Sequence, residues 1–239
     1  MGAQQLAWCG NDCMVLSVFD KLVIIGPNEH EFIELKARSE GIYCMTEMDG
    51  LRVLNSEKTY FFERVQDTLK NTFALASIAP SAKLHNAQKS VDFNTPRADE
   101  IIRDLGKKTI DGIESLMNAA EYEHKDIDVL KHLLTTASFA KKFSDPADLD
   151  PNQYVLLVKH SIVLTKLRHS PVLARAITYQ QLKSFKAKNI AKLLLKYRDY
   201  RLAITVIKQL NLKNLSLVYE DWCTQMLRYS AKSERVLIE

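Results

Sequence analysis

The chain has 239 residues, of which 46% are hydrophobic and 26% charged, and its formal net charge is +4. These values are typical of a globular protein and exclude a disordered or fibrous chain. Only 7 glycines and 6 prolines occur, and the sequence contains no G-x-G-x-x-G, G-x-x-x-x-G-K-S/T or G-x-S-x-G motif, which excludes the common nucleotide-binding loops and the nucleophile elbow of hydrolases.

The sequence also bears on the compartment. No segment approaches the roughly 20 apolar residues that span a bilayer, and the first residues lack the basic and apolar regions of a signal peptide. Four cysteines, Cys9, Cys13, Cys44 and Cys223, are too few and too scattered for a disulfide framework. We therefore expect a soluble protein in a reducing, cytoplasmic setting.

Residues 1–66 carry the pattern of a β meander. Short segments rich in β-branched and aromatic residues recur about every ten residues, separated by turn residues. The dipeptide Asp49-Gly50 predicts a type I′ hairpin turn. About six strands amount to one to one and a half blades of a β-propeller, so we expect the terminal part of a propeller. The predicted strands cover residues 13–18, 21–25, 31–35, 41–45, 51–54 and 59–65.

A junction over residues 67–95 follows, and the hydrophobic period changes there to that of a helix. Two short helical turns are predicted over 73–79 and 82–87, interrupted by Pro80. One helical segment over 98–120, containing Gly106 and Gly112, and a helix over 126–143 come next. Asp150 or Asn152 is then expected to cap the following helix.

The remainder predicts a series of amphipathic helices joined by short connections. Connections of two to four residues require antiparallel neighbours, and successive hairpins that each bury one face form an α-solenoid. The predicted fold class is therefore mainly α: an α-solenoid over 96–239 preceded by a short antiparallel β meander. The later helices are expected at residues 153–168, 172–177, 180–197, 199–210 and 213–229.

Charge is distributed unevenly along the chain. Residues 151–198 contain ten Lys or Arg residues and no Asp or Glu. One interpretation is a solvated outer helix face; the other is a surface for an anionic partner, either an acidic protein or lipid head groups. Nucleic acid is not favoured, because aromatic residues do not alternate with the basic ones. The candidate anion-binding residues are Lys183, Lys186, Lys188, Lys192, Lys196 and Arg198.

Catalytic and metal-binding patterns are weak. Cys9-x-x-x-Cys13 has no second ligand pair at zinc-site spacing, and Asp145-x-x-Asp148-x-Asp150 lacks the glycine and terminal glutamate of a calcium loop. The six histidines are dispersed and none follows a known catalytic motif. We predict no enzyme activity, no catalytic residues, no cofactor and no metal; only a site assembled in space from distant residues would contradict this.

Five segments, in order along the chain, match the pattern of one known family: Leu6-Ala-Trp-Cys-Gly-Asn-Asp12, Met48-Asp-Gly-Leu-Arg-Val53, Ala76-Ser-Ile-Ala-Pro80, Ile177-Thr-Tyr-Gln180 and Leu202-Ala-Ile204. With these segments the chain resembles the vacuolar protein sorting-associated protein 16 family, over nearly its whole length. The first two segments look like the closing propeller blade of that family.

The resemblance implies a core subunit of the class C tethering complexes HOPS and CORVET, which act in fusion at endosomes and vacuoles or lysosomes. It implies a propeller followed by a solenoid, no enzyme activity, and a cytoplasmic protein peripheral on those membranes. The implied partners are other propeller-solenoid subunits and the Sec1/Munc18-like subunit, the latter through a region beyond this chain, which would be a central fragment. The alternative function is a peripheral module that binds anionic lipids through residues 151–198.

Overall fold

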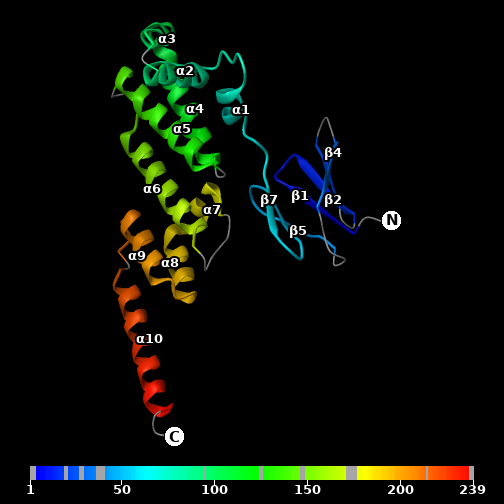
Figure 1. Cartoon of the computed structure of the whole chain (residues 1–239), viewed down its shortest axis with the longest axis vertical. Helices are drawn as coiled ribbons and strands as arrows, with labels where there is room; N and C mark the ends of the chain where they lie inside the picture. The colour runs from blue at the N-terminus through cyan, green and yellow to red at the C-terminus, as the bar shows by residue number, and fades with distance from the viewer. Residues whose placement is uncertain are drawn as a thin grey trace. The chain divides into compact units, whose positions relative to one another are not determined.

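The computed structural model describes residues 4–18, 21–26, 30–35, 41–93, 95–123, 126–145, 149–170, 177–213 and 215–236, without the side chains of 186–188 and 230–236. The chain forms two compact units, one ending at Val65 and the other starting at Gln66 (Figure 1). The first unit consists of strands and the second of helices, as the sequence predicts.

The first unit contains two antiparallel sheets whose strands follow one another in chain order. The predicted strands are confirmed with small shifts of their ends, and a first strand, which was not predicted separately, precedes them. The four-stranded sheet contains β1 (Gln5–Cys9), β2 (Cys13–Val18), β3 (Lys21–Ile25) and β4 (His30–Glu34), and the three-stranded sheet contains β5 (Tyr43–Thr46), β6 (Leu51–Leu54) and β7 (Thr59–Phe62).

The two sheets share one core. Val15 and Leu22 from the first sheet and Leu51 and Val53 from the second are fully buried in it. The side-chain amide of Gln5 in β1 joins the sheets at their edges: its Nε2 donates to the carbonyl of Cys44 in β5 at 2.6 Å, and its Oε1 accepts from the Cys44 N–H at 2.8 Å. One side chain thereby makes both hydrogen bonds that a neighbouring strand residue would make.

The turn at Gly50 differs from the prediction. A type I′ turn needs a positive φ at both central residues, and Gly50 does not have one. Glycine is required there for space, because a Cβ on Gly50 would lie 2.3 Å from the carbonyl oxygen of Phe62. The prediction of a type I′ turn was therefore wrong, although the hairpin between β6 and its neighbour β5 forms.

The second unit is helical over most of its length. Its core is formed by leucine, isoleucine, valine and alanine side chains contributed by successive helices. The helices are α1 (Asp67–Phe73), α2 (Pro80–Asp92), α3 (Arg97–Leu105), α4 (Thr109–Tyr122), α5 (Ile127–Ala140), α6 (Pro151–Arg168), α7 (Tyr179–Ser184), α8 (Lys186–Lys196), α9 (Tyr200–Gln209) and α10 (Leu215–Val236).

Two boundaries early in this unit correct the sequence analysis. Pro80 does not interrupt a helix but begins α2, where its missing N–H has no intrahelical partner to lose. The predicted single segment over 98–120 is two helices, because Gly106 adopts a φ of 48° and ends α3. Gly112 remains inside α4 and allows close packing against α2: a Cβ there would lie 2.6 Å from Leu84.

The predicted helix over 180–197 is also two helices, α7 and α8, which meet at Phe185. Asp150, rather than Asn152, caps α6, since its carboxylate accepts the Asn152 N–H at 2.9 Å. The helix expected over 172–177 falls almost entirely outside the described residues. In the described part of the chain, none of the helices combines the length and the apolar character needed to cross a membrane.

Candidate interaction surface

Helix α8 carries four of the six predicted anion-binding residues, and the side chains of two of them are described. Ile190 and Leu194 face the core and are buried, whereas Lys192 and Lys196 are exposed and, being four residues apart, share one face of the helix. The side chains of Lys186 and Lys188 lie outside the part of the chain that the structure describes.

Lys183 and Arg198 are engaged elsewhere. Lys183 lies on α7, where its charge acts on Glu121 and His160. Arg198 lies in the connection between α8 and α9; its guanidinium donates to the Tyr229 hydroxyl and lies 5.4 Å from the centre of that ring. Four predicted residues have described side chains. Lys192 and Lys196 share one exposed face of α8, whereas Lys183 and Arg198 make their contacts elsewhere and do not belong to that face.

The contacts of Lys183 belong to a polar cluster where α4, α6 and α7 meet. The buried Tyr179 hydroxyl bonds the Glu121 carboxylate and lies 3.5 Å from Nδ1 of His160. Burial raises the pKa of Glu121, which Lys183 partly offsets; burial and the Glu121 charge raise the pKa of Tyr179 to about 12. These groups hold the short α7 against two longer helices, and no pattern in the sequence predicts that they meet.

Helix α10 has few buried side chains. Among those described, Val218 is fully buried, and Trp222 stacks on Tyr200 of α9 with ring centres 5.9 Å apart. The Tyr200 hydroxyl also donates to Asp221 at 3.1 Å. With 22 residues against 10, α10 is longer than α9 by roughly 18 Å and continues past its end (Figure 1).

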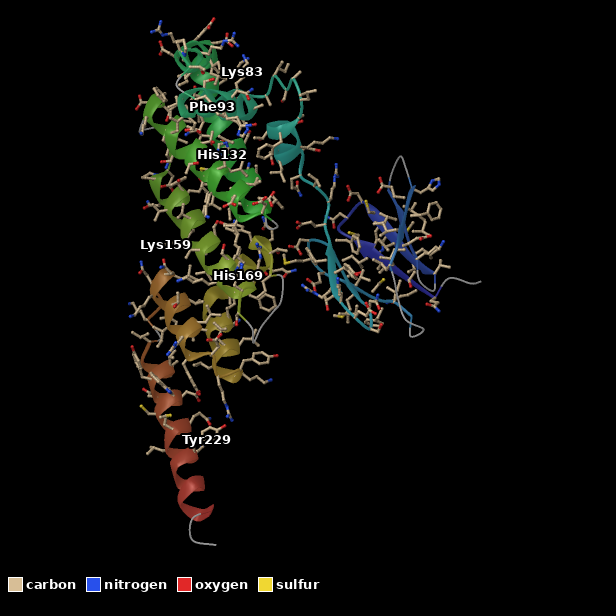
Figure 2. All side chains as sticks on the ribbon, in the orientation of Figure 1. Lys83, Phe93, His132, Lys159, His169 and Tyr229 are labelled. Carbon is tan, nitrogen blue, oxygen red and sulfur yellow. The ribbon has the colours of Figure 1, made fainter. Side chains whose placement is uncertain are left out.

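The apolar residues of α10 form a surface, which we call the α10 face. Tyr219, Trp222, Met226 and Tyr229 are spaced by three, four and three residues, so they lie on one side of the helix. Their exposed fractions are 42%, 43%, 62% and 56%. An amphipathic helix normally buries such a face against a neighbour, so the α10 face has the character of a protein-binding surface. Tyr229 is labelled in Figure 2.

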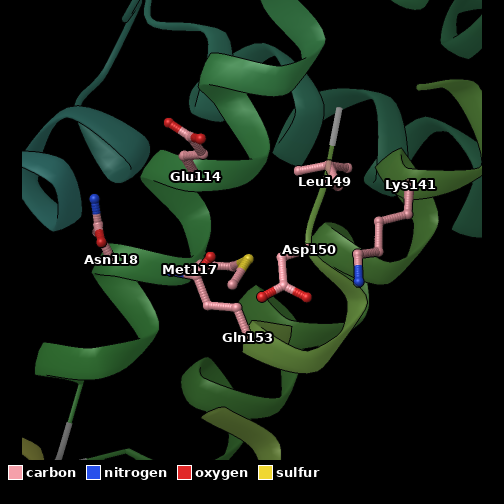
Figure 3. A pocket seen from close by; sticks show the side chains of 7 residues that line it. All are labelled: Glu114, Met117, Asn118, Lys141, Leu149, Asp150 and Gln153. Atoms are coloured by element: carbon pink, nitrogen blue, oxygen red, sulfur yellow. The ribbon is translucent and has the colours of Figure 1, made fainter. Parts of the chain in front are cut away.

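A pocket of about 230 Å³ lies between α4, the end of α5 and the start of α6 (Figure 3). Lys141 lies against the Tyr154 ring, 4.2 Å from its centre. Burial lowers the pKa of Lys141, and the charge of Asp150 opposes that shift. Asp150 also caps α6, so its carboxylate has a structural role in addition to lining the pocket. The lining residues are Glu114, Met117, Asn118, Lys141, Leu149, Asp150 and Gln153.

Two of the cysteines lie opposite each other in the first unit, and two of the histidines lie in contact with each other in the second. Cys9 and Cys13 are cross-strand partners in β1 and β2, and burial raises the pKa of Cys9 to about 11, which disfavours the reactive thiolate. His85 and His132, 47 residues apart in the sequence, meet between α2 and α5. Within the described ranges, no group of three or more His, Cys, Asp or Glu side chains is arranged to hold a metal ion.

The family model described as Vps16, N-terminal region, matches residues 2–155 of the chain, which is more than half of its length. The chain belongs to the Vps16 family. The resemblance identified in the sequence is thereby confirmed. The family model ends within α6, so the helices from α7 onward lie beyond it.

Curated relatives cover the later helices as well. The chain is 27% identical to the vacuolar protein sorting-associated protein 16 of Saccharomyces cerevisiae, over 96% of the chain and 28% of the relative. It is 27% identical to the protein VACUOLELESS1 of Arabidopsis thaliana, over 99% of the chain and 27% of the relative. It is 29% identical to a vacuolar protein sorting-associated protein 16 homolog of Drosophila melanogaster, over 91% of the chain and 26% of the relative. The chain therefore spans about a quarter of the length of these Vps16 relatives.

Proposed function

We propose that this Vps16 chain is a non-enzymatic scaffold segment of a multisubunit membrane-tethering complex that acts in endosome and vacuole or lysosome fusion and in vacuolar protein sorting. The observation that carries the proposal is the α10 face, in which four large apolar side chains are exposed on one side of a long helix. The names of the relatives, which refer to the vacuole and to protein sorting, support the biological setting. A peripheral position on the cytoplasmic side of endosomal and vacuolar membranes follows from this proposal.

We propose further that the first unit is the end of a β-propeller. Both faces of its four-stranded sheet are apolar. One face packs on β5–β7, and the other carries a cross-strand row formed by Leu6, Leu16, Val23 and Phe32, of which Leu6 and Phe32 are 60% and 65% exposed. A sheet with two apolar faces is suited to a position between two other sheets, as in a propeller.

The helical unit is proposed to be an α-solenoid. Each of its later helices packs on the next, α8 on α9 and α9 on α10, and the connections are short. Stacked hairpins of this kind present helix faces along their length, which partner subunits can use. The proposed partners are other class C subunits, whereas the Sec1/Munc18-like subunit is proposed to bind beyond this chain.

The proposal is tested by co-purification of the chain with the other class C subunits. Met226→Glu places a charge on the α10 face, and we expect it to weaken partner retention by tenfold or more. Thr224→Glu introduces the same charge on the opposite side of α10 and should leave retention unchanged. Equal retention of partners by both variants, or no retention by the unmodified chain at micromolar concentration, would contradict the proposal.

The anionic-membrane alternative receives less support. It needs a continuous basic surface, but Lys183 interacts with Glu121, and Arg198 interacts with Tyr229 on α10. Lys192 and Lys196 supply two positive charges, each worth about 1 kcal/mol at an anionic surface. The attraction from these two residues alone is too weak for stable binding, and the side chains of Lys186 and Lys188 lie outside the described part of the chain.

A further inference from the structure

A buried polar contact joins helices α2 and α5. Nδ1 of His85 lies 3.0 Å from Nε2 of His132, and the two rings are perpendicular with centres 4.6 Å apart. His85 is 6% exposed, whereas His132, labelled in Figure 2, is partly exposed. At this distance the two nitrogens form a hydrogen bond, which requires one N–H donor and one unprotonated acceptor.

The surroundings of His85 do not favour a positive charge. From α1 the uncharged Phe73 ring contacts it edge-on, with centres 5.1 Å apart. Burial disfavours its protonated form most, Lys89 one turn along α2 and His132 from α5 add to this effect, and its pKa lies at about 4 instead of 6.5. From α4, Gly112 packs on Leu84, and on the α3 side of α2, Lys83 pairs with Asp104.

We propose that the His85–His132 pair is a proton-dependent latch between α2 and α5, closed while Nδ1 of His85 is unprotonated and accepts a hydrogen bond from His132, and opened when His85 takes up a proton. In the closed state both rings are neutral, and Nε2–H of His132 donates to Nδ1 of His85. When His85 takes up a proton, its Nδ1 no longer accepts and a positive charge is placed in a buried site beside Lys89, so the bond is lost and opening is favoured. The latch is independent of the proposed function, because it concerns the packing of α2 on α5 and not the α10 face.

The direction of the pH effect follows from linkage. In an open or unfolded chain, His85 becomes protonated below about pH 6.5. In the closed latch, the same ring stays neutral until the pH falls to about 4. Acidification therefore favours the open form. The equilibrium constant for opening rises by up to tenfold for each pH unit between 6.5 and 4, and the latch is fully stable above 6.5.

Hydrogen exchange of the whole chain between pH 7.5 and 5.0, corrected for the intrinsic exchange rate, tests the latch. We expect protection of α2 and α5 to fall by up to tenfold per unit below pH 6.5, while α9 stays protected. His85→Gln should abolish the fall, because the amide can still bond His132 but does not titrate. His160→Gln, which changes another partly buried histidine, should leave it intact.

An equal loss in all helices, or the same fall in the His85→Gln variant, would overturn the proposal. If that variant does not fold, nitrogen-15 spectra of the histidine rings in the unmodified chain decide the question. His85 that remains neutral down to pH 5.5 supports the latch, whereas titration of His85 near pH 6.5 contradicts it.

Discussion

The strand unit and the helical unit differ in how much of their apolar surface each can bury by itself. Among the described residues, the core of the strand unit has nine buried side chains, whereas that of the helical unit has 24. The strand unit also leaves an apolar sheet face exposed, with Leu6 and Phe32 more than half accessible. Because the larger helical unit buries more apolar surface in total, we expect it to be the more stable of the two, and the strand unit to depend more on individual contacts between its sheets.

The chain contains two tryptophans, Trp8 in the strand unit and Trp222 in the helical unit. Each can serve as the fluorescence probe of its own unit once the other is changed to Phe. Unfolding by urea, followed in the Trp8→Phe and Trp222→Phe backgrounds, thus measures the stability of the two units separately.

The largest effect is expected for Leu194→Ala in α8. Leu194 is fully buried, so its truncation leaves a cavity and should cost about 3 kcal/mol of unfolding free energy. The loss should be confined to the helical unit, as reported by Trp222. Leu217→Ala, at a residue that is 45% exposed, is the control and should change stability by less than about 1 kcal/mol. A similar loss from both variants would contradict the core assignment.

Gly50→Ala should produce the next largest loss of unfolding free energy, and this loss should occur in the strand unit. The added Cβ would meet the Phe62 carbonyl and the Phe61 ring, so β6 and β7 must separate at a cost of roughly 2–3 kcal/mol. Gly10→Ala is the comparison and should cost about 1 kcal/mol, because Gly10 has a φ of 67° but a Cβ there would make only an ordinary contact, 3.8 Å from Asp12. Equal unfolding free energies for the two variants, measured by Trp8 fluorescence, would show that close packing does not require a glycine at position 50.

Gln5→Ala should cost about 1–2 kcal/mol in the strand unit, since it removes both hydrogen bonds to Cys44. Gln5→Glu is a sharper version, because a carboxylate accepts the Cys44 N–H but cannot donate to its carbonyl. We expect the Glu variant to be less stable than wild type at pH 7 and to recover partly when the carboxyl group is protonated. Trp8 fluorescence against urea at pH 7 and pH 4.5 measures this.

The smallest effect is expected for the charge reversal Lys192→Glu with Lys196→Glu. Both side chains are exposed, so stability should change by less than about 0.5 kcal/mol. Flotation with neutral and anionic vesicles should give the same bound fraction for the variant and the unmodified chain. A selective loss of binding to anionic vesicles would instead favour the lipid-binding alternative.

Sequence patterns predicted the order of strands and helices because alternation and helical periodicity are local properties. They failed where spatial contacts decide: Gly50 is required by the distant Phe62, and α7 and α8 separate at Phe185, which has ordinary helix propensity. The His85–His132 contact joins residues that no sequence motif connects. The α10 face could have been found, since its three- and four-residue spacing is visible, but not its exposure.

The attachment of α10 fixes the direction in which its apolar face points. The helix is held at Val218, which is buried near its start, and at Tyr229, which lies under Arg198. These positions are 11 residues apart, or about 16 Å along the axis. Asp221 and Trp222, which contact Tyr200, lie within about one turn of Val218. Without the contact at Tyr229 the helix would be held over that one turn, and a tilt of about 10° there would displace its far end by roughly 5 Å. Arg198, one of the predicted anion-binding residues, therefore fixes the orientation of α10 through its contact with Tyr229.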